Sequence, residues 1–352
     1  MTINADLYNI LSEFRMDLEA NAITSTDGTG EKRRKQKPSR TPEELDLWLE
    51  QQLFDVLSNT AGGHDYFCCT DASNSNKDKN NDCARSAASR LPSHVETHRL
   101  EDSDVSCSST LHCHDLAANP VSPLSNNRLY TNVSDIPLSV KLEHQPYILP
   151  PRSAFLMGNV KTVALIPQQF DCIVLDPPWE NKSVKRKRAG CGYTWNSCDV
   201  LQQLPMQTLL APDGVVFLWI TNNKRLQNWI CDKVLSAWRL EVAVKWYWLK
   251  VTRSGKPVHD LHSTHSKRPY ETLLVAKRTA DVSSSEQRRV IISVPSAQHS
   301  RKPPLNEIMD RIMAHRPRPL KILELFARQV LPDTVAIGNQ VLMYQHRSCF
   351  ID

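Results

Sequence analysis

Apolar residues near the N-terminus follow the 3.6-residue period of an amphipathic helix in two stretches. The first face consists of Leu7, Ile10, Leu11, Phe14 and Leu18, and the second of Leu45, Leu49, Leu53, Val56 and Leu57. Thr41 can cap the second helix, Pro42 fits its first position, and Glu44 completes a capping box. We therefore predict a small helical module over residues 1–60.

A polar stretch follows from residue 61 to residue 127. It includes runs such as residues 74–82 and lacks apolar periodicity, so it offers little surface to bury and is predicted to be a disordered linker. Cys107, His112, Cys113 and His114 within it are residue types that Zn²⁺ accepts. Pairs of ligands with two other residues between them, as zinc sites use, are missing there, and we expect no metal.

Short β-rich apolar runs alternate with helical stretches over residues 128–352. This alternation predicts an α/β domain with a mostly parallel sheet. The predicted strands are Asp171–Leu175, Val215–Ile220, Glu241–Leu249, Thr272–Ala276, Val290–Val294, Leu320–Leu325 and Thr334–Ile337. The predicted helices are Asn223–Trp238 and Pro304–His315.

Composition and charge narrow the class of protein only slightly. Lys and Arg number 43 against 38 Asp and Glu, a net charge of +5 that fits a nucleic-acid partner without demanding one. Basic residues 32–37 could be a nuclear import signal or a solvated linker. Scattered cysteines indicate reduced thiols, so we expect the nucleus and, as a second location, the cytoplasm. No run approaches the roughly 20 apolar residues of a membrane helix, and we expect no membrane contact.

The strongest chemical signal is a tetrad, Asp176, Pro177, Pro178 and Trp179, directly after an apolar strand. Ligands of open α/β sheets bind beyond the carboxyl ends of the strands, so the tetrad should face a cleft. Two prolines stiffen the turn and lack amide donors, which leaves Asp176 and the Pro177 carbonyl as acceptors. Two acceptors match the two hydrogens of an adenine amino group, and Trp179 could stack on the base. A strand that simply ends at a proline turn is the structural alternative.

On the tetrad and the later motifs, the chain resembles the adenine amino-methyltransferases of the messenger-RNA adenosine methyltransferase type, most closely the methyltransferase-like-four branch. The resemblance covers roughly residues 155–344. It implies a Rossmann-like class I methyltransferase fold of the α/β class, with S-adenosylmethionine as cofactor. The motif order is permuted, because the tetrad precedes the cofactor motif at residues 321–328.

The resemblance also implies roles for single residues of the cofactor site. The predicted strand Leu320–Leu325 carries Glu324 near its end, where an acidic group can bind a ribose hydroxyl. By resemblance, Glu324 and Phe326 lie near the cofactor and Lys302 pairs with its carboxylate. The ribose contacts expected by resemblance come from Arg328, Asn339 and Gln340. Val330 departs from the family, which has histidine there, so we expect no ribose contact from that position.

On the substrate side, the resemblance matches Trp219, Trp248, Lys250 and Glu271, although a single Trp is more often part of a core. Tyr193 resembles an acceptor-loop tyrosine in a loop of different shape. The basic run Lys185, Arg186, Lys187 and Arg188 could clamp phosphates, serve in nuclear import or form a solvated loop. His259, His262 and His265 are expected in a substrate loop or on the surface, not as metal ligands.

These patterns favour direct transfer of a methyl group to the adenine 6-amino nitrogen. RNA is the expected partner. The resemblance points to adenosine of a small nuclear RNA in 2′-O-methylated form, with DNA adenine as the alternative. Methylation of a protein amide and a non-catalytic RNA-binding adaptor of the same fold are further alternatives. A Gly-x-Gly-x-x-Gly motif is missing, which argues against a dinucleotide oxidoreductase. We expect a monomer without an obligate protein partner.

Overall fold

The computed structural model describes residues 43–59, 112–122, 124–125, 128–179, 197–251, 257–262, 268–278, 288–293, 295 and 301–350. The strands are β1 (His112–Asp115), β2 (Val121–Ser122), β3 (Arg128–Asn132), β4 (Leu138–Leu142), β5 (Gln145–Leu149), β6 (Ser153–Leu156), β7 (Phe170–Leu175), β8 (Leu210–Ile220), β9 (Glu241–Lys250), β10 (Tyr270–Lys277), β11 (Arg288–Ser293), β12 (Ile322–Leu325) and β13 (Thr334–Ile337). The helices are α1 (Glu44–Asn59), η4 (Val160–Leu165), α5 (Ser197–Gln203), α6 (Met206–Leu209), α7 (Lys224–Trp229), η6 (Ile230–Leu235), α8 (Ser236–Trp238), α9 (Asn306–Ile312) and η8 (Arg347–Cys349).

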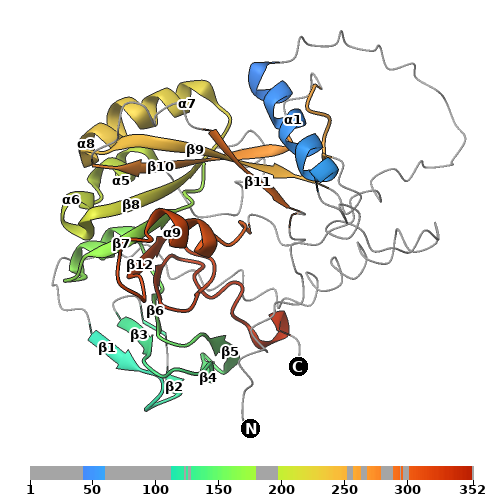
Figure 1. The fold of residues 1–352 in the computed structure, drawn as a ribbon. Helices are drawn as coiled ribbons and strands as arrows, with labels where there is room; N and C mark the ends of the chain where they lie inside the picture. Colours follow the sequence, from blue (N-terminus) through green and yellow to red (C-terminus); the bar gives the residue numbers. More distant parts are fainter. Residues whose placement is uncertain are drawn as a thin grey trace, which may run out of the picture.

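One large sheet dominates the fold (Figure 1). Its ten strands lie in the order β1-β3-β6-β13-β12-β7-β8-β10-β9-β11, and β2, β4 and β5 form a separate three-stranded sheet. The neighbours from β6 to β8 are all parallel, whereas β10 runs antiparallel to β8 and to β9. The expected Rossmann-like α/β fold with a mostly parallel sheet is therefore confirmed.

Side chains of the central strands alternate between two core clusters. Ile173 and Leu175 of β7 pack with Trp238 and with residues of η4, α5, α6 and η6 on one face of the sheet. Cys172 and Val174 pack with residues of α9 on the other face. All of β7 is buried, as expected for a parallel strand with helices on both sides. The result is a three-layer arrangement with the sheet in the middle.

The predicted elements of this region are found in the structure with shifted ends. Each of the seven predicted strands is present, and β8 begins earlier, at Leu210. The predicted helix Asn223–Trp238 is continuous through α7, η6 and α8; the Asn223 side chain caps its start, and Arg239 ends it in the left-handed conformation. Helix α9 spans only Asn306–Ile312, so it is shorter at both ends than the predicted helix Pro304–His315.

The predicted linker needs correction at its C-terminal end. Strands β1 and β2 lie within residues 112–122, and β1 pairs in parallel with β3. The sequence of β1 is His-Cys-His-Asp, so it has no apolar run that would mark it locally. Backbone pairing with β3 makes this segment a strand. The periodicity of the sequence does not reveal such a pairing.

Helix α1 packs against the main sheet. Its Leu49 and Leu53 are buried in one cluster with Tyr247, Leu249 and Tyr270 of β9 and β10. The first predicted helix, over residues 7–18, and the caps Thr41 and Pro42 lie outside the described residues. What the structure shows of the N-terminal module is thus a helix joined to the α/β core.

Two further observations concern membranes and metals. Within the described ranges, no helix has both the length and the apolar character needed to cross a bilayer. The described residues also contain no group of three His, Cys, Asp or Glu side chains placed to hold a metal ion. Of the possible zinc ligands, Cys107 and the side chains of His112 and Cys113 lie outside the described residues.

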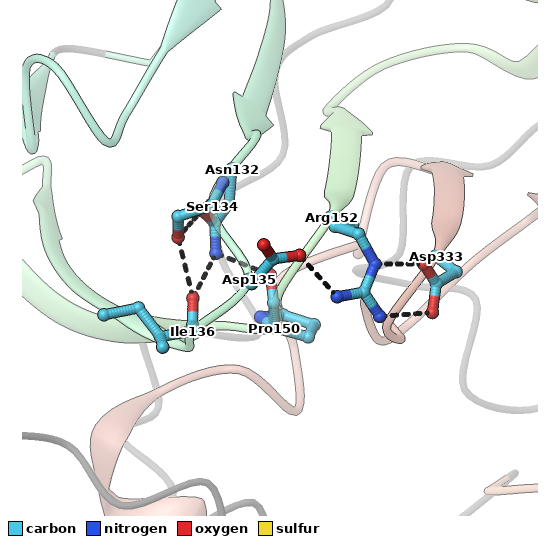
Figure 2. Close-up of polar contacts among 7 residues, drawn as sticks. All are labelled: Asn132, Ser134, Asp135, Ile136, Pro150, Arg152 and Asp333. Atoms are coloured by element: carbon cyan, nitrogen blue, oxygen red, sulfur yellow. Dashed lines mark hydrogen bonds and ion pairs between the residues drawn. The ribbon is translucent and has the colours of Figure 1, made fainter. Parts of the chain in front are cut away.

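Figure 2 shows a polar network that joins the β3–β4 turn to the rest of the domain. The buried amide of Asn132 donates to the carbonyls of Ile136 (3.0 Å) and Pro150 (2.7 Å), and its oxygen accepts from the Ser134 amide. Beside it, the half-exposed Arg152 bridges Asp135 and Asp333. The network contains one buried centre and one solvent-facing ion-pair group.

We expect the buried centre to contribute more to stability than the ion pairs. Asn132→Ala should lower the free energy of unfolding by about 1–3 kcal/mol, because it removes the buried hydrogen bonds of the Asn132 side chain and leaves the Pro150 carbonyl with the Ser153 hydroxyl alone. Arg152→Ala should cost much less, since water screens exposed ion pairs. Urea denaturation of both variants measures the difference, and an equal or larger loss for Arg152→Ala would contradict this ranking.

Candidate active site

The strand register brings the predicted site residues to one edge of the sheet. Leu175, the last residue of β7, pairs with Leu325 of β12 and with Leu218 of β8. Asp176, Phe326 and Trp219 each follow one of these residues, so they come together at the carboxyl edge. Because β10 is antiparallel, its start lies at the same edge, beside the end of β9. The permuted motif order therefore still builds a single site.

Asp176 lies between two cations. Its Oδ1 is 3.1 Å from the Nζ of Lys302, and its Oδ2 accepts a 2.9 Å hydrogen bond from Nη1 of Arg328. Burial alone would lower the pKa of Lys302, but Asp176 and Glu271 outweigh it and raise that pKa. Lys302 is thus held as a cation against the tetrad, and it also lies 5.6 Å from the centre of the Trp219 ring.

Glu271 is the second carboxylate of the site, and it too contacts two cations, both of them lysines. Its Oε2 is 2.9 Å from Lys302 Nζ, and its Oε1 accepts a short hydrogen bond from Lys250. Burial opposes ionisation of Glu271, yet Lys302 and Lys250 lower its pKa to about 2. A chain of alternating charges therefore runs from Arg328 through Asp176, Lys302 and Glu271 to Lys250.

The tryptophans near the site are mostly held by the protein itself. Trp219 and Trp248 are fully buried in one core cluster and meet edge to face at 6.0 Å, which agrees with a core role for each. Trp248 also lies under Lys250, whose Nζ is 4.5 Å from the ring centre. Trp179 is half-buried, and its indole donates to the Trp219 carbonyl at 2.9 Å, which fixes its orientation.

A pocket opens beside Asp176. Of the predicted residues, it is lined by Asp176, Trp219, Lys302, Glu324, Phe326 and Arg328. Sequence reasoning missed other lining residues, among them Arg301, Asn306, Leu331, Thr334 and Tyr344. Only Arg301 carried a local signal, as the neighbour of Lys302. About 680 Å³ of its space is free of protein atoms, and part of this space is open to solvent.

The side of this pocket that follows β12 is shaped by two close backbone approaches. Phe326, directly after β12, has a left-handed φ of 61°, and the Ala327 amide donates to the Ile337 carbonyl at 3.0 Å. A Cβ on Gly338 would lie 2.5 Å from the Ala327 oxygen, so only glycine allows this approach. The pocket wall therefore depends on contact between the segments that follow β12 and β13.

Glu324 differs electrostatically from the other site carboxylates. Burial, together with the negative charge of Asp176, raises its pKa to about 8, and Arg328 opposes this shift only in part. Its carboxyl group thus lies in the pocket as an acid that is half protonated near pH 8. A ligand that donates hydrogen bonds to Glu324 would favour its charged form.

Several predicted residues are not part of the pocket lining among the described residues. Asn339 and Gln340 follow β13 and Gly338 at the same edge of the sheet, and neither lines the pocket. Pro177, Pro178 and Trp179 continue the turn after Asp176, outside the lining.

Other predicted residues are placed elsewhere or not described. Tyr193, the run from Lys185 to Arg188, and His265 lie outside the described residues. Val330 is buried in a separate apolar cluster, and its amide donates to Gln345 Oε1 at 3.1 Å. His262 is half-buried beside α1, where it contacts Glu50 at 3.1 Å.

Comparison with known proteins agrees with this geometry. Human METTL4, an N(6)-adenine-specific methyltransferase, is 37% identical over 243 residues, which cover 65% of this chain and 48% of the relative. MTA1 of Pyricularia oryzae, an N6-methyladenosine RNA methyltransferase, is 38% identical over 218 residues, or 58% of this chain and 57% of the relative. A DNA N6-methyl methyltransferase of Caenorhabditis elegans is 34% identical over 210 residues, with 58% and 55% covered.

The chain spans about half the length of the curated relatives it matches. Residues 170–340 match the MT-A70 family. This segment begins with β7, contains the tetrad and the charge chain, and ends just after Gly338. Residues 170–340 of this chain are therefore an MT-A70 family domain.

Proposed function

We propose that this protein is an S-adenosylmethionine-dependent methyltransferase that methylates the 6-amino group of adenine in nucleic acid. The single observation that carries the proposal is the position of Asp176, whose carboxylate lies at the wall of the pocket beside Lys302, Glu324 and Arg328. The named activities of the relatives, all adenine N6 methylation, support the same reaction.

The donor set of the pocket fits S-adenosylmethionine. Lys302 offers a cation to the methionine carboxylate, and Glu324 offers an acceptor to ribose hydroxyls. Phe326 and Leu331 provide apolar wall for the adenine ring. Arg328, with Asn339 and Gln340 beyond the lining, would complete the ribose contacts. When bound, this cofactor supplies a methyl group activated by a sulfonium centre.

The protein's own contribution would be positioning. Asp176 and the Pro177 carbonyl accept the two amino hydrogens of the target adenine and direct the nitrogen lone pair toward the methyl donor. Lys302 and Arg328 compensate the charge of Asp176, and a second lone pair on each carboxylate oxygen remains for the base. Preorganised groups of this kind need not reorganise during the reaction. The product then loses a proton to water.

We propose RNA as the main substrate class, and adenosine of a small nuclear RNA, in 2′-O-methylated form, as the first target to test. DNA adenine is the second candidate, because a base swung out of a duplex offers the same face as a single-stranded one. The names of the relatives include both RNA and DNA enzymes. The basic run at residues 32–37 supports a nuclear location.

The direct test uses the purified chain, labelled cofactor, and RNA and DNA oligonucleotides of matched sequence, followed by nucleoside analysis. We expect N6-methyladenosine in RNA, with at least tenfold less product in DNA. Preferred methylation of DNA would reverse the substrate assignment. No methylated adenine in either polymer would favour the adaptor alternative.

The acceptor role of Asp176 predicts a specific loss of turnover. Asp176→Asn keeps the shape of the side chain but removes its charge and one acceptor oxygen, so kcat should fall on the order of a hundredfold or more. Calorimetry should find cofactor binding retained. The exposed Asp232→Asn variant is the matched control and should turn over normally. Near-wild-type turnover by Asp176→Asn would refute the assignment.

Lys302→Ala should weaken cofactor binding, which Asp176→Asn should leave intact. It removes the cation assigned to the methionine carboxylate, so the cofactor Kd should rise by on the order of tenfold or more. Titration calorimetry with the cofactor measures this change directly. An unchanged Kd would exclude the proposed carboxylate contact.

The raised pKa of Glu324 predicts a pH-dependent cost in the ligand-free protein. The unfolded carboxyl loses its proton near pH 4.5 and the folded one near pH 8. Between these values the unfolded chain binds fewer protons, so this group lowers stability as pH rises. Glu324→Gln should therefore stabilise the protein at pH 8 by on the order of 1 kcal/mol or more, with little change at pH 5. Thermal melts across this range test it, and an equal effect at both pH values would contradict it.

A further inference from the structure

Helix α1 and Glu43, the residue directly before it, meet the rest of the chain through ion pairs, and α1 also does so through its apolar face. The pairs are Glu43–Lys224 (3.8 Å), Glu44–Arg288 (2.9 Å), Asp46–Arg268 (3.3 Å) and Glu50–His262 (3.1 Å). In three of them one partner is more than half exposed, and such pairs contribute little. The pair Asp46–Arg268 differs, because its side chains are only 1% and 10% exposed.

The buried pair connects α1 to two points of the β9–β10 connection. Arg268 Nη1 contacts Asp46 Oδ2 and also donates to the Leu261 carbonyl at 2.7 Å. Asp46 Oδ2 in turn accepts from the Glu43 amide. A buried charge that loses its partner is strongly unfavourable, so this contact holds α1 and the connection together.

Arg268 stands three residues before Glu271, the carboxylate that holds Lys302. Between them, the Pro269 carbonyl accepts from the Lys250 amide at 2.7 Å, and the Tyr270 carbonyl accepts from the Asn222 side chain at 2.8 Å. The Tyr270 ring is buried in the same cluster as Leu49 and Leu53 of α1. The backbone that presents Glu271 is therefore held on one side by α1.

We propose that α1 is part of the acceptor half of the site, and that Asp46 and Arg268 are positioning residues which act through Glu271 and Lys250. This inference rests on the proposed methyltransferase function. The pair fixes the start of β10, and the start of β10 sets where Glu271 meets Lys302 beside Asp176. Loss of the pair displaces this end of the charge chain, while the cofactor wall built by β12 and β13 stays in place.

The test uses full-length Asp46→Asn, Arg268→Gln and the double variant. Each should lower kcat for nucleic-acid methylation roughly ten- to hundredfold, with the cofactor Kd within twofold of the wild-type value. Because the pair acts as one unit, the double variant should be no worse than the single ones. Arg268→Lys keeps the charge and should recover most of the activity. Glu44→Gln removes an exposed pair of the same helix and serves as the matched control.

Amide hydrogen exchange supplies a readout that does not depend on activity. In Asp46→Asn, exchange should accelerate at Lys250 and Tyr270, whereas β7 and β12 should keep wild-type protection. Turnover of Asp46→Asn and Arg268→Gln equal to that of Glu44→Gln would overturn the proposal. So would loss of cofactor binding in step with turnover, because the pair would then stabilise the whole domain. An active Asp176→Asn, assayed in parallel, would instead overturn the proposed function.

Discussion

The site depends on the compensation of Asp176, a carboxylate placed at the end of a fully buried parallel strand. A carboxylate in such a position is costly unless cations reach it. Lys302 and Arg328 do so from 126 and 152 residues further along the chain. Each is brought there by a different part of the fold: Lys302 precedes α9, and Arg328 follows β12. The fold is therefore required to bring both cations to Asp176.

This compensation extends into a longer chain of charges. Lys302 is shared by Asp176 and Glu271, and Glu271 is shared by Lys302 and Lys250. Each member limits where its neighbours can lie, so Lys302 fixes the positions of Asp176 and Glu271 relative to each other. Glu324 stands apart, since burial outweighs the help it gets from Arg328. A carboxyl pKa raised in this way is typical of functional sites.

Helix α1 shows how far this coupling can reach. It is separated by 222 residues from Arg268, to which its Asp46 is paired, and it packs under the strands that carry Lys250 and Glu271. Polar networks elsewhere, such as that of Asn132, hold the small sheet side of the domain. The contacts of α1 and the Asn132 network lie at opposite ends of the large sheet, and only the contacts of α1 are adjacent to the charge chain.

The sequence by itself determined the fold class, the seven strands of residues 170–340 and the place of the tetrad. These features have local causes: a buried parallel strand needs a short apolar run, and two prolines must end it. The resemblance added the cofactor motif and named Lys302 and Glu271, but not that they touch. Tertiary structure alone decided the charge chain, the burial of Trp219 and Trp248, the strand at His112–Asp115 and the docking of α1. Each of these arises from partners far apart in sequence, and the spacing of residues along a chain carries no record of such contacts.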